Sequence, residues 1–314
     1  MMSPIKVSRL QGGAVLQAFV VTVLWSTSWV LIKIGLKADL PAVSFAGLRY
    51  TLALICLLPF VLLNREARAG LHRLSRLDWF RLALLGVVFY SLTQGAQFLG
   101  LAYLPAATLS LLLSFTPVFV ALFGGLFTRE RPSMPQWTGI VLSVAGAVIY
   151  FLPLSSFAGQ TIGLLVGLAA LAANSASSLL GRWINRDSGL SPLPVTAVSM
   201  GIGGTLLLGT GAAIQGIGAL SFTDLLLIAW LAIVNTAFAF VLWNKSLRTL
   251  SAVQSSIING LMLPQIALLA WVFLAEPLTS RQMAGLVLVM TGAIVVQVWR
   301  GRQVGATLNR SDSG

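Results

Sequence analysis

The chain has 314 residues, of which 57% are hydrophobic and only 9% are charged, and its formal net charge is +12. Charged side chains cover surfaces that face water and make up about 25% of a soluble protein. This composition therefore excludes an ordinary soluble domain and indicates a surface that faces lipid. The basic excess does not indicate nucleic-acid binding, because the Lys and Arg residues lie between apolar runs, where they act as topology signals.

Apolar segments follow one another along the chain, each close to the length of about 20 residues that crosses a bilayer. Continuous apolarity over such lengths predicts helices rather than the short alternating strands of a barrel, and therefore an all-α integral membrane protein of ten spans. The first half is predicted to hold spans at 14–36, 42–63, 79–101, 106–127 and 134–153. The second half is predicted to hold spans at 162–183, 193–214, 222–245, 251–273 and 280–299.

The distribution of positive charges predicts the orientation. With the N-terminus inside the cell, sixteen of the twenty Lys and Arg residues fall in cytoplasmic segments. Only Lys33, Lys37 and Arg281 fall on the other side, and Arg49 falls within a span. Because Lys and Arg accumulate in cytoplasmic loops, we expect both termini to be cytoplasmic in a multi-pass protein of the cell membrane.

The two halves of the chain resemble each other, most clearly near their ends. The matched pairs share one separation along the chain and are Glu130 with Glu276, Ser133 with Thr279, Gln136 with Gln282, Gly139 with Gly285, and Gly146 with Gly292. The Ser or Thr followed three residues later by Gln reads as a capping box that opens the last span of each half. Since five spans are an odd number, the second half must cross the membrane in the opposite sense. We therefore expect two inverted five-helix repeats, 14–153 and 162–299, with a substrate site near the midplane between them.

Several motifs carry a resemblance to a known family. They are Trp25-Ser26-Thr27-Ser28-Trp29 with Lys33, then Pro41, Phe45 and Arg49, the prolines of the fourth and ninth spans, and Glu130 and Glu276 with their downstream glycines. With these motifs, residues 14–299 resemble the EamA-type proteins of the drug/metabolite transporter superfamily, and within them the YddG-like bacterial amino-acid exporters. The resemblance implies a bacterial inner-membrane protein that moves metabolites, often outward, through a central cavity walled by spans one to four and six to nine. Ile202 stands where the second half would repeat Arg49, so a role of that arginine is not duplicated.

Polar and aromatic residues inside the spans are the candidate substrate contacts. Tyr90, Gln94 and Gln97 are spaced to share one face of the third span, and glutamine in hydrocarbon needs a hydrogen-bond partner or water. They would line a cavity, or alternatively bond neighbouring helices together. Trp25 and Trp29 of the first span are candidates too, although Trp29 could simply anchor the span at the membrane interface. The second half adds Asn174, Asn235, Asn259 and Met262.

Arg49, Lys33 and two prolines have candidate roles in gating. A charge within a span is a functional hypothesis by default, so Arg49, together with Lys33 at the outer end of the first span, is predicted to gate the site or to contact a substrate carboxylate. The alternative for Arg49 is that it braces helix ends or extends its stem towards the interface. Pro117 and Pro264 lie near the middle of their spans and could act as hinges, although static bends are the alternative.

The lack of acidic residues and histidine inside the predicted spans limits the possible functions. No acidic residue lies at the centre of a span, and His72, the only histidine, lies in a loop. We therefore expect no metal site, no cofactor and no enzyme activity, and neither proton coupling nor a cationic substrate. The absence of a G-x-x-x-x-G-K-[ST] run excludes ATP-driven pumping.

The remaining polar residues suit a neutral or zwitterionic solute with an apolar part. The prediction is thus a secondary transporter of small metabolites, amino acids first and aromatic ones included, that works by alternating access as an exporter or facilitator. A passive channel, or export of other metabolites or drugs, remains the alternative. The expected partners are the small-molecule substrate and the lipid bilayer, and the oligomeric state is left open.

Overall fold

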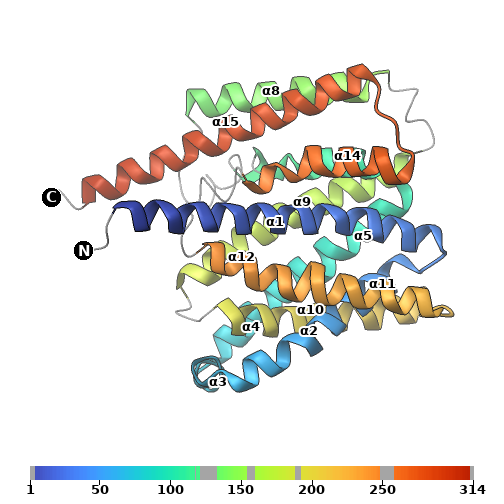
Figure 1. The fold of residues 1–314 in the computed structure, drawn as a ribbon, viewed down its shortest axis with the longest axis vertical. Helices are drawn as coiled ribbons and strands as arrows, with labels where there is room; N and C mark the ends of the chain where they lie inside the picture. The colour runs from blue at the N-terminus through green and yellow to red at the C-terminus, as the bar shows by residue number, and fades with distance from the viewer. Residues whose placement is uncertain are drawn as a thin grey trace.

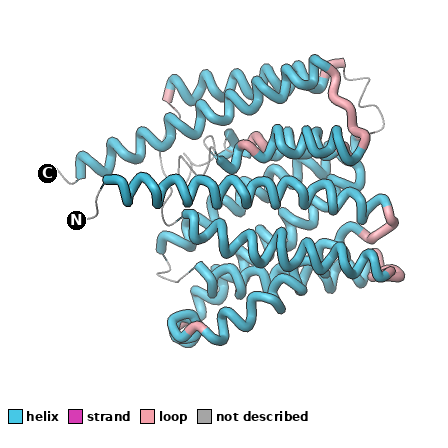
Figure 2. The backbone as a smooth tube through the Cα atoms, in the orientation of Figure 1, coloured by secondary structure: helices cyan, strands magenta, loops and turns pink. Residues whose placement is uncertain are grey.

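The structure is a computed structural model that describes residues 4–116, 118–120, 133–153, 160–187, 192–247 and 258–311. Within these ranges the chain is helical and has no strand (Figure 2). The elements of the first half are α1 Pro4–Lys37, α2 Ala42–Leu63, α3 Arg65–His72, α4 Arg76–Leu85, η1 Gly86–Thr93, α5 Gln94–Tyr103, α6 Ala106–Leu113 and α8 Met134–Phe151. Those of the second half are α9 Thr161–Asp187, α10 Pro192–Ile214, α11 Phe222–Ala232, η3 Ile233–Phe238, α12 Ala239–Leu247, α14 Met262–Leu274 and α15 Ser280–Ser311.

These elements form the ten predicted spans. Among the described residues, seven helical segments are long and apolar enough to cross a membrane, and three shorter apolar helices accompany them, which contain α6, α14 and the first part of α15. The third span is built from α4, η1 and α5, and the eighth from α11, η3 and α12. The prediction of an all-α membrane protein with ten spans in two inverted five-helix repeats is confirmed.

Two boundaries differ from the predicted ones. The first helix begins at Pro4 rather than at residue 14, and the last continues to Ser311 rather than to 299. Neither extension contains a proline beyond the first helical position, where proline is tolerated. A short helix, α3, also forms in the predicted loop after the second span. It begins where the Asn64 side chain accepts a hydrogen bond of 3.0 Å from the Ala67 amide, which is the usual way to cap a helix start.

Capping boxes open equivalent helices in both halves. The Gln136 side chain accepts from the Ser133 amide at 2.7 Å and the Gln282 side chain from the Thr279 amide at 2.9 Å, as predicted. A second pair opens the third and eighth spans, where Asp78 and Asp224 accept from the amides of the serines three residues before them. Since each box satisfies amides that a helix start leaves free, the same local signals begin the same spans in each half.

Helices that are equivalent in the two halves pack against equivalent partners. In the second half the counterpart of α1 is α9. Helix α1 packs against α12 and α14, while α9 packs against the matching helices α5 and α6. Helix α2 packs against its own counterpart, α10, and α8 against α15. Figure 1 shows α8 and α15 side by side at one edge of the bundle.

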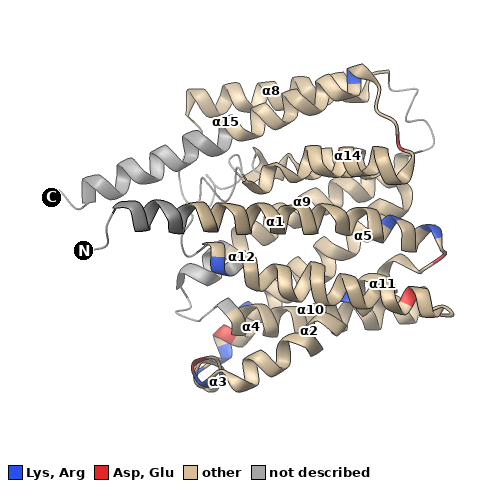
Figure 3. Ribbon diagram, viewed as in Figure 1, with Lys and Arg blue, Asp and Glu red and all other residues tan. Residues whose placement is uncertain are grey.

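Two ends of the bundle can be distinguished. Helix α1 begins and α15 ends on the same side, here called the terminal end, and the opposite side, where α1 ends, is called the Lys37 end (Figure 1). Most charged residues of the described chain gather near these two ends (Figure 3), and Arg49 is an exception that is buried within a span. This distribution is the one expected for a bundle that spans a membrane, since charges in hydrocarbon are costly.

Glycines allow α8 and α15 to approach closely. A Cβ atom added at Gly285 would lie 2.7 Å from the Gly146 carbonyl oxygen, and one added at Gly146 would lie 2.7 Å from the Val289 amide nitrogen. Small residues at such contacts let helix backbones meet, and packing of this kind drives helix association in membranes.

We expect the substitution Gly285→Ala to lower the free energy of unfolding by about 1–3 kcal/mol, the usual cost of forcing a methyl group into a packed contact. The measurement is thermal unfolding of the purified protein in detergent. Gly209→Ala on α10 is the matched control, because an added Cβ there would meet nothing within 4 Å. Equal stability losses in the two variants would contradict the proposed role of this contact.

Candidate substrate site

The fourth and ninth spans are interrupted at equivalent places. Helix α6 ends at Leu113 and a turn follows at Ser114 and Phe115, while a turn at Leu261 precedes α14. Each turn comes two or three residues before the proline of its span, Pro117 or Pro264. Proline has no N–H to donate to the carbonyl four residues earlier, so the interruptions follow from the sequence. Paired interruptions of this kind point to a binding site in transporters with inverted repeats.

The prediction of hinges at the two prolines stays a prediction. Pro117 itself lies outside the described residues, whereas Pro264 lies in the first turn of α14. Amides in the first turn of a helix have no intrahelical partner, so the missing N–H of Pro264 costs α14 no hydrogen bond.

The third and eighth spans depart from α-helical geometry as well. Segments η1 and η3 are π-helical turns, in which hydrogen bonds join residues five apart. In η1 the Thr93 hydroxyl donates to the Val88 carbonyl, and in η3 the Thr236 hydroxyl donates to the Leu231 carbonyl, both at 2.8 Å. Each threonine thus satisfies a carbonyl five residues earlier. Turns of this type are frequent at functional sites, and here they occupy matching spans.

Arg49 joins the second span to η3 and to the first span. Its side chain is only 5% exposed. It donates to the Thr236 hydroxyl at 2.8 Å, to the Ser28 hydroxyl at 3.0 Å and to the Asn235 carbonyl at 3.5 Å. The guanidinium also lies 5.3 Å from the centre of the Tyr50 ring. These contacts fit the bracing alternative, because Arg49 bonds a carbonyl of the π-turn and fixes it against α1.

The Tyr50 hydroxyl connects Arg49 to the predicted polar face of the third span. It donates to the Gln94 side-chain oxygen at 2.6 Å, and its ring packs edge-on against Tyr90 with the centroids 5.5 Å apart. Tyr90 is buried, and Gln97, one turn beyond Gln94, is half-buried. Two residues of the predicted face therefore have polar partners in the core: Gln94 bonds Tyr50, and the buried Tyr90 hydroxyl bonds the side chain of Ser199.

Asn174 and Asn235 are each bonded to a span of the first half. The Asn174 amide donates at 2.8 Å to the hydroxyl of Thr116, which donates in turn to Leu113, the carbonyl that Pro117 leaves unpaired. The Asn235 amide donates to the Leu24 carbonyl and, at 3.2 Å, to the Thr27 hydroxyl, whereas its own side-chain oxygen is buried without a partner among the described residues. Each asparagine thus links one half of the chain to the other.

The other predicted residues lie in different surroundings. Trp29 is buried in the main apolar core, Met262 is half-buried against the same core, and Asn259 is exposed. The sequence reasoning missed Gln265, whose oxygen accepts from the Ser26 hydroxyl at 2.9 Å and so bonds α14 to α1. Its position one residue after Pro264 is the signal that could have identified it.

Three aromatic rings meet between α1 and the eighth span. The Trp25 ring lies 5.4 Å from that of Phe240 and 5.2 Å from that of Trp243, and all three side chains are half-buried. Phe240 and Trp243 were not among the predicted site residues. They hold the positions in the second half that Gln94 and Gln97 hold in the first, at the separation that relates Glu130 to Glu276. The repeat therefore carries polar groups in one half and aromatic groups in the other.

Lys33 lies near the Lys37 end and is bonded to the end of α5. Its ammonium donates to the carbonyls of Leu101 and Leu104, each at 2.6 Å. Nearby, the Glu276 carboxylate accepts from the Ala106 amide at 2.8 Å. Burial raises the pKa of the Glu276 carboxyl above its ordinary value, while the Ala106 amide and the Lys33 charge oppose that shift. Glu276 was matched to Glu130 from the sequence but was not predicted to belong to a site.

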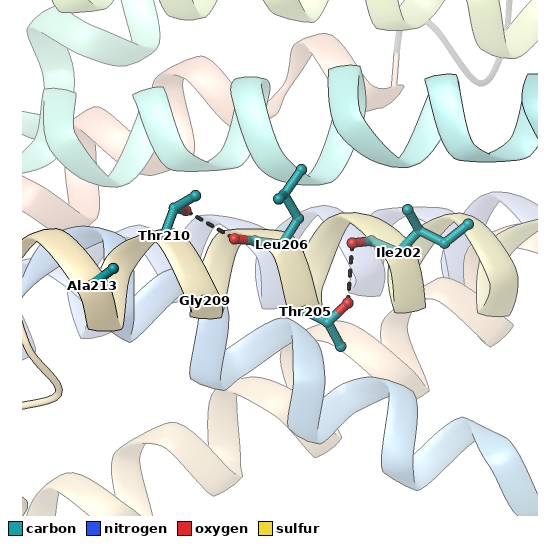
Figure 4. A pocket seen from close by; sticks show the side chains of 6 residues that line it. All are labelled: Ile202, Thr205, Leu206, Gly209, Thr210 and Ala213. Atoms are coloured by element: carbon teal, nitrogen blue, oxygen red, sulfur yellow. Dashed lines mark hydrogen bonds between the residues drawn. The ribbon is translucent and has the colours of Figure 1, made fainter.

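A separate hollow of about 560 Å³ lies on one face of α10 (Figure 4). Its lining residues are Ile202, Thr205, Leu206, Gly209, Thr210 and Ala213. Both threonine hydroxyls donate to carbonyls of their own helix, which leaves an apolar lining with no group to orient a polar solute. The candidate site is therefore the set of polar and aromatic side chains inside the bundle, and not this hollow.

Comparisons with known proteins agree with this geometry. A sequence model of the EamA-like transporter family matches residues 12–152 and 161–298. The chain is 29% identical to the uncharacterized transporter YvbV of Bacillus subtilis (strain 168), over 94% of each chain. It is 28% identical to a probable amino-acid metabolite efflux pump of Salmonella typhimurium, over 88% of this chain and 92% of that one. A crystal structure with 19% identity shares the fold, with a TM-score of 0.63 over 91% of this chain and 98% of the other.

Proposed function

The chain belongs to the EamA-like transporter family, and on that premise we propose that it is a secondary carrier that exports or exchanges small neutral or zwitterionic metabolites. Amino acids, aromatic ones included, are the favoured substrates. The carrier works by alternating access between the inverted repeats 14–153 and 162–299, with both termini in the cytoplasm of a bacterial cell. A relative named as an amino-acid metabolite efflux pump supports this substrate class.

One observation carries the proposal. In the third, fourth, eighth and ninth spans the α-helix is interrupted or locally rewound, at related places in the two halves. The side chains bonded at these places come from both halves and include Asn174, Asn235 and Arg49. A carrier needs a site shared by two parts that can move against each other, and these contacts between the halves are of that kind.

The chemistry of the side chains supports an amphipathic solute. Trp25, Phe240 and Trp243 offer half-buried aromatic surface for an apolar side chain, while Gln94 and Asn174 offer neutral donors and acceptors. A guanidinium has five N–H donors, and the bonds of Arg49 within the described chain use three of them. The remaining donors would bond a substrate carboxylate, which accepts from them; this is the second role predicted for Arg49.

The test is uptake of a panel of labelled amino acids into proteoliposomes, with and without a pH gradient and with or without unlabelled substrate inside. A carrier of this kind is expected to show saturable uptake that preloading accelerates and that a pH gradient leaves unchanged. Flux that rises in proportion to concentration, with no acceleration by preloading, would instead identify a passive channel. The lack of transport of any amino acid would refute the substrate class while leaving the family and the fold unaffected.

A further inference from the structure

Oppositely charged side chains satisfy two adjoining helix ends at the Lys37 end. Lys33 bonds the carbonyls of Leu101 and Leu104, at the C-terminal end of α5, and Glu276 bonds the amide of Ala106, the first residue of α6. A helix presents partial negative charge at its C-terminus and partial positive charge at its N-terminus. The positive charge of Lys33 therefore faces the negative end of α5, and the negative charge of Glu276 faces the positive end of α6, on either side of the short turn between these helices.

The start of α6 depends on Glu276 for its cap. The residue before the helix is Pro105, which provides no side-chain hydrogen bond to the helix start. The chain reaches this place through Ala275, whose φ of 54° is left-handed and costs a residue other than glycine about 1–2 kcal/mol. Glu276 also belongs to the second half of the chain, whereas Lys33, α5 and α6 belong to the first. The cap is therefore a contact between the halves.

Next to these contacts, the interior of the Lys37 end is packed with apolar side chains. Ile32, Leu104, Leu109, Ala270 and Leu274 are all at most 6% exposed and belong to one cluster. They come from the first, fourth and ninth spans and, at Leu104, from the residue that follows the third. In the fourth span, residues 106–112 are all buried, whereas the side chains from Leu113 to Thr116 are half-buried. Exposure thus rises from the Lys37 end towards the interruptions at the middle of the bundle.

We propose that Lys33 and Glu276 form a latch that holds the Lys37 end closed in this conformation, and that this latch must release before a substrate can pass that end. The inference rests on the proposed carrier function and adds a gate to it. For the Lys37 end to open, the start of α6 must separate from the connection between α14 and α15. That movement breaks the bond from Ala106 to Glu276, and movement of α1 away from α5 breaks the bonds of Lys33.

The test measures the accessibility of each end with single cysteines. Cys56 is the only native cysteine, so Cys56→Ala provides the background for two reporters. Ala270→Cys reports on the apolar layer at the Lys37 end, and Ala18→Cys reports on α1 near the terminal end; both alanines are 0% exposed. The protein is held in lipid nanodiscs, where a soluble maleimide reaches both ends, and the labelling rate is followed without substrate.

Without the cap, labelling of the Ala270→Cys reporter is expected to become about tenfold faster in the Glu276→Ala variant, which corresponds to 1.4 kcal/mol. Lys33→Met is expected to act in the same direction. Glu276→Gln keeps an oxygen that can accept from the Ala106 amide and should label slowly. Asp39→Asn is the matched control, because Asp39 is an exposed acidic residue at the same end with a φ of 63°, a conformation that asparagine tolerates.

Two results would overturn the latch. One is unchanged labelling of the Ala270→Cys reporter in both Glu276→Ala and Lys33→Met. The other is equal acceleration at both reporters, which would show that the residues stabilise the whole fold and not one end. If Glu276→Ala does not fold, as judged by gel filtration, Lys33→Met and Glu276→Asp take its place. The labelling assay does not require transport. A failed transport assay would therefore count against the proposed carrier function, while the labelling rates would still test the latch.

Discussion

Replacing Arg49 by lysine is expected to reduce the initial rate of uptake in proteoliposomes at least tenfold. An arginine side chain presents a fork of donors, whereas a lysine ammonium acts as a single point charge. We therefore expect a lysine ammonium to lose at least one of the three bonds that Arg49 makes, to the Ser28 and Thr236 hydroxyls and the Asn235 carbonyl. Bonds to a charged group contribute about 1.5–3 kcal/mol each, so the loss of one is enough for the expected effect.

The companion measurement for Arg49→Lys is thermal unfolding of the same preparation. A brace between α1, α2 and η3 predicts lower stability together with slower uptake of every substrate. A carboxylate contact predicts that KM rises for amino acids while stability changes little. Arg281→Lys is the control, because Arg281 is exposed and near the start of α15. Wild-type uptake and stability in Arg49→Lys would rule out both roles.

The second large effect is expected at Trp25. Trp25→Ala removes a ring that packs against Phe240 and Trp243, and aromatic pairs contribute about 0.5–1.5 kcal/mol each beyond their buried area. If these rings receive the substrate side chain, KM for aromatic amino acids should rise about tenfold, with a much smaller change for aliphatic ones. The measurement is concentration-dependent uptake of one aromatic and one aliphatic substrate.

Trp25→Phe separates recognition from packing, since it keeps an aromatic face at the same place. This variant should recover most of the affinity for aromatic substrates. If Trp25→Ala instead slows aromatic and aliphatic substrates equally and lowers the unfolding temperature, the three rings act as a packing contact between α1 and the eighth span. That outcome would remove them from the proposed site.

The large-scale fold is predictable because its signals are local. Apolar length defines the spans, and the capping pairs, such as Ser133 with Gln136, lie three residues apart and are readable in the sequence. The relation between the halves is equally visible in the matched glutamates and glycines. The short helix α3 escaped prediction because it has only eight residues, fewer than the roughly 11–18 over which an apolar period can be recognised.

The contacts of the candidate site are harder to predict because they join distant parts of the chain. The sequence identifies Arg49 as unusual, but it does not show that its partners are Ser28 and Thr236, which depends on the crossing of α1, α2 and η3. Likewise, the carboxylate of Glu276 reaches an amide in another span, and no local pattern records that contact. The π-turns leave no composition signal at all.

Those π-turns affect how residues should be compared across the third and eighth spans. An α-helix turns by about 100° per residue, and a π-turn takes up one residue more than an α-turn. A helical wheel drawn at constant pitch through Arg76–Tyr103 therefore misplaces everything after η1 relative to everything before it. In the same way, deleting one residue between 86 and 93 would restore a regular helix and rotate Gln94 and Gln97 by roughly that angle. A single-residue gap at this place in an alignment of relatives would thus mark a change in which side chains face the interior.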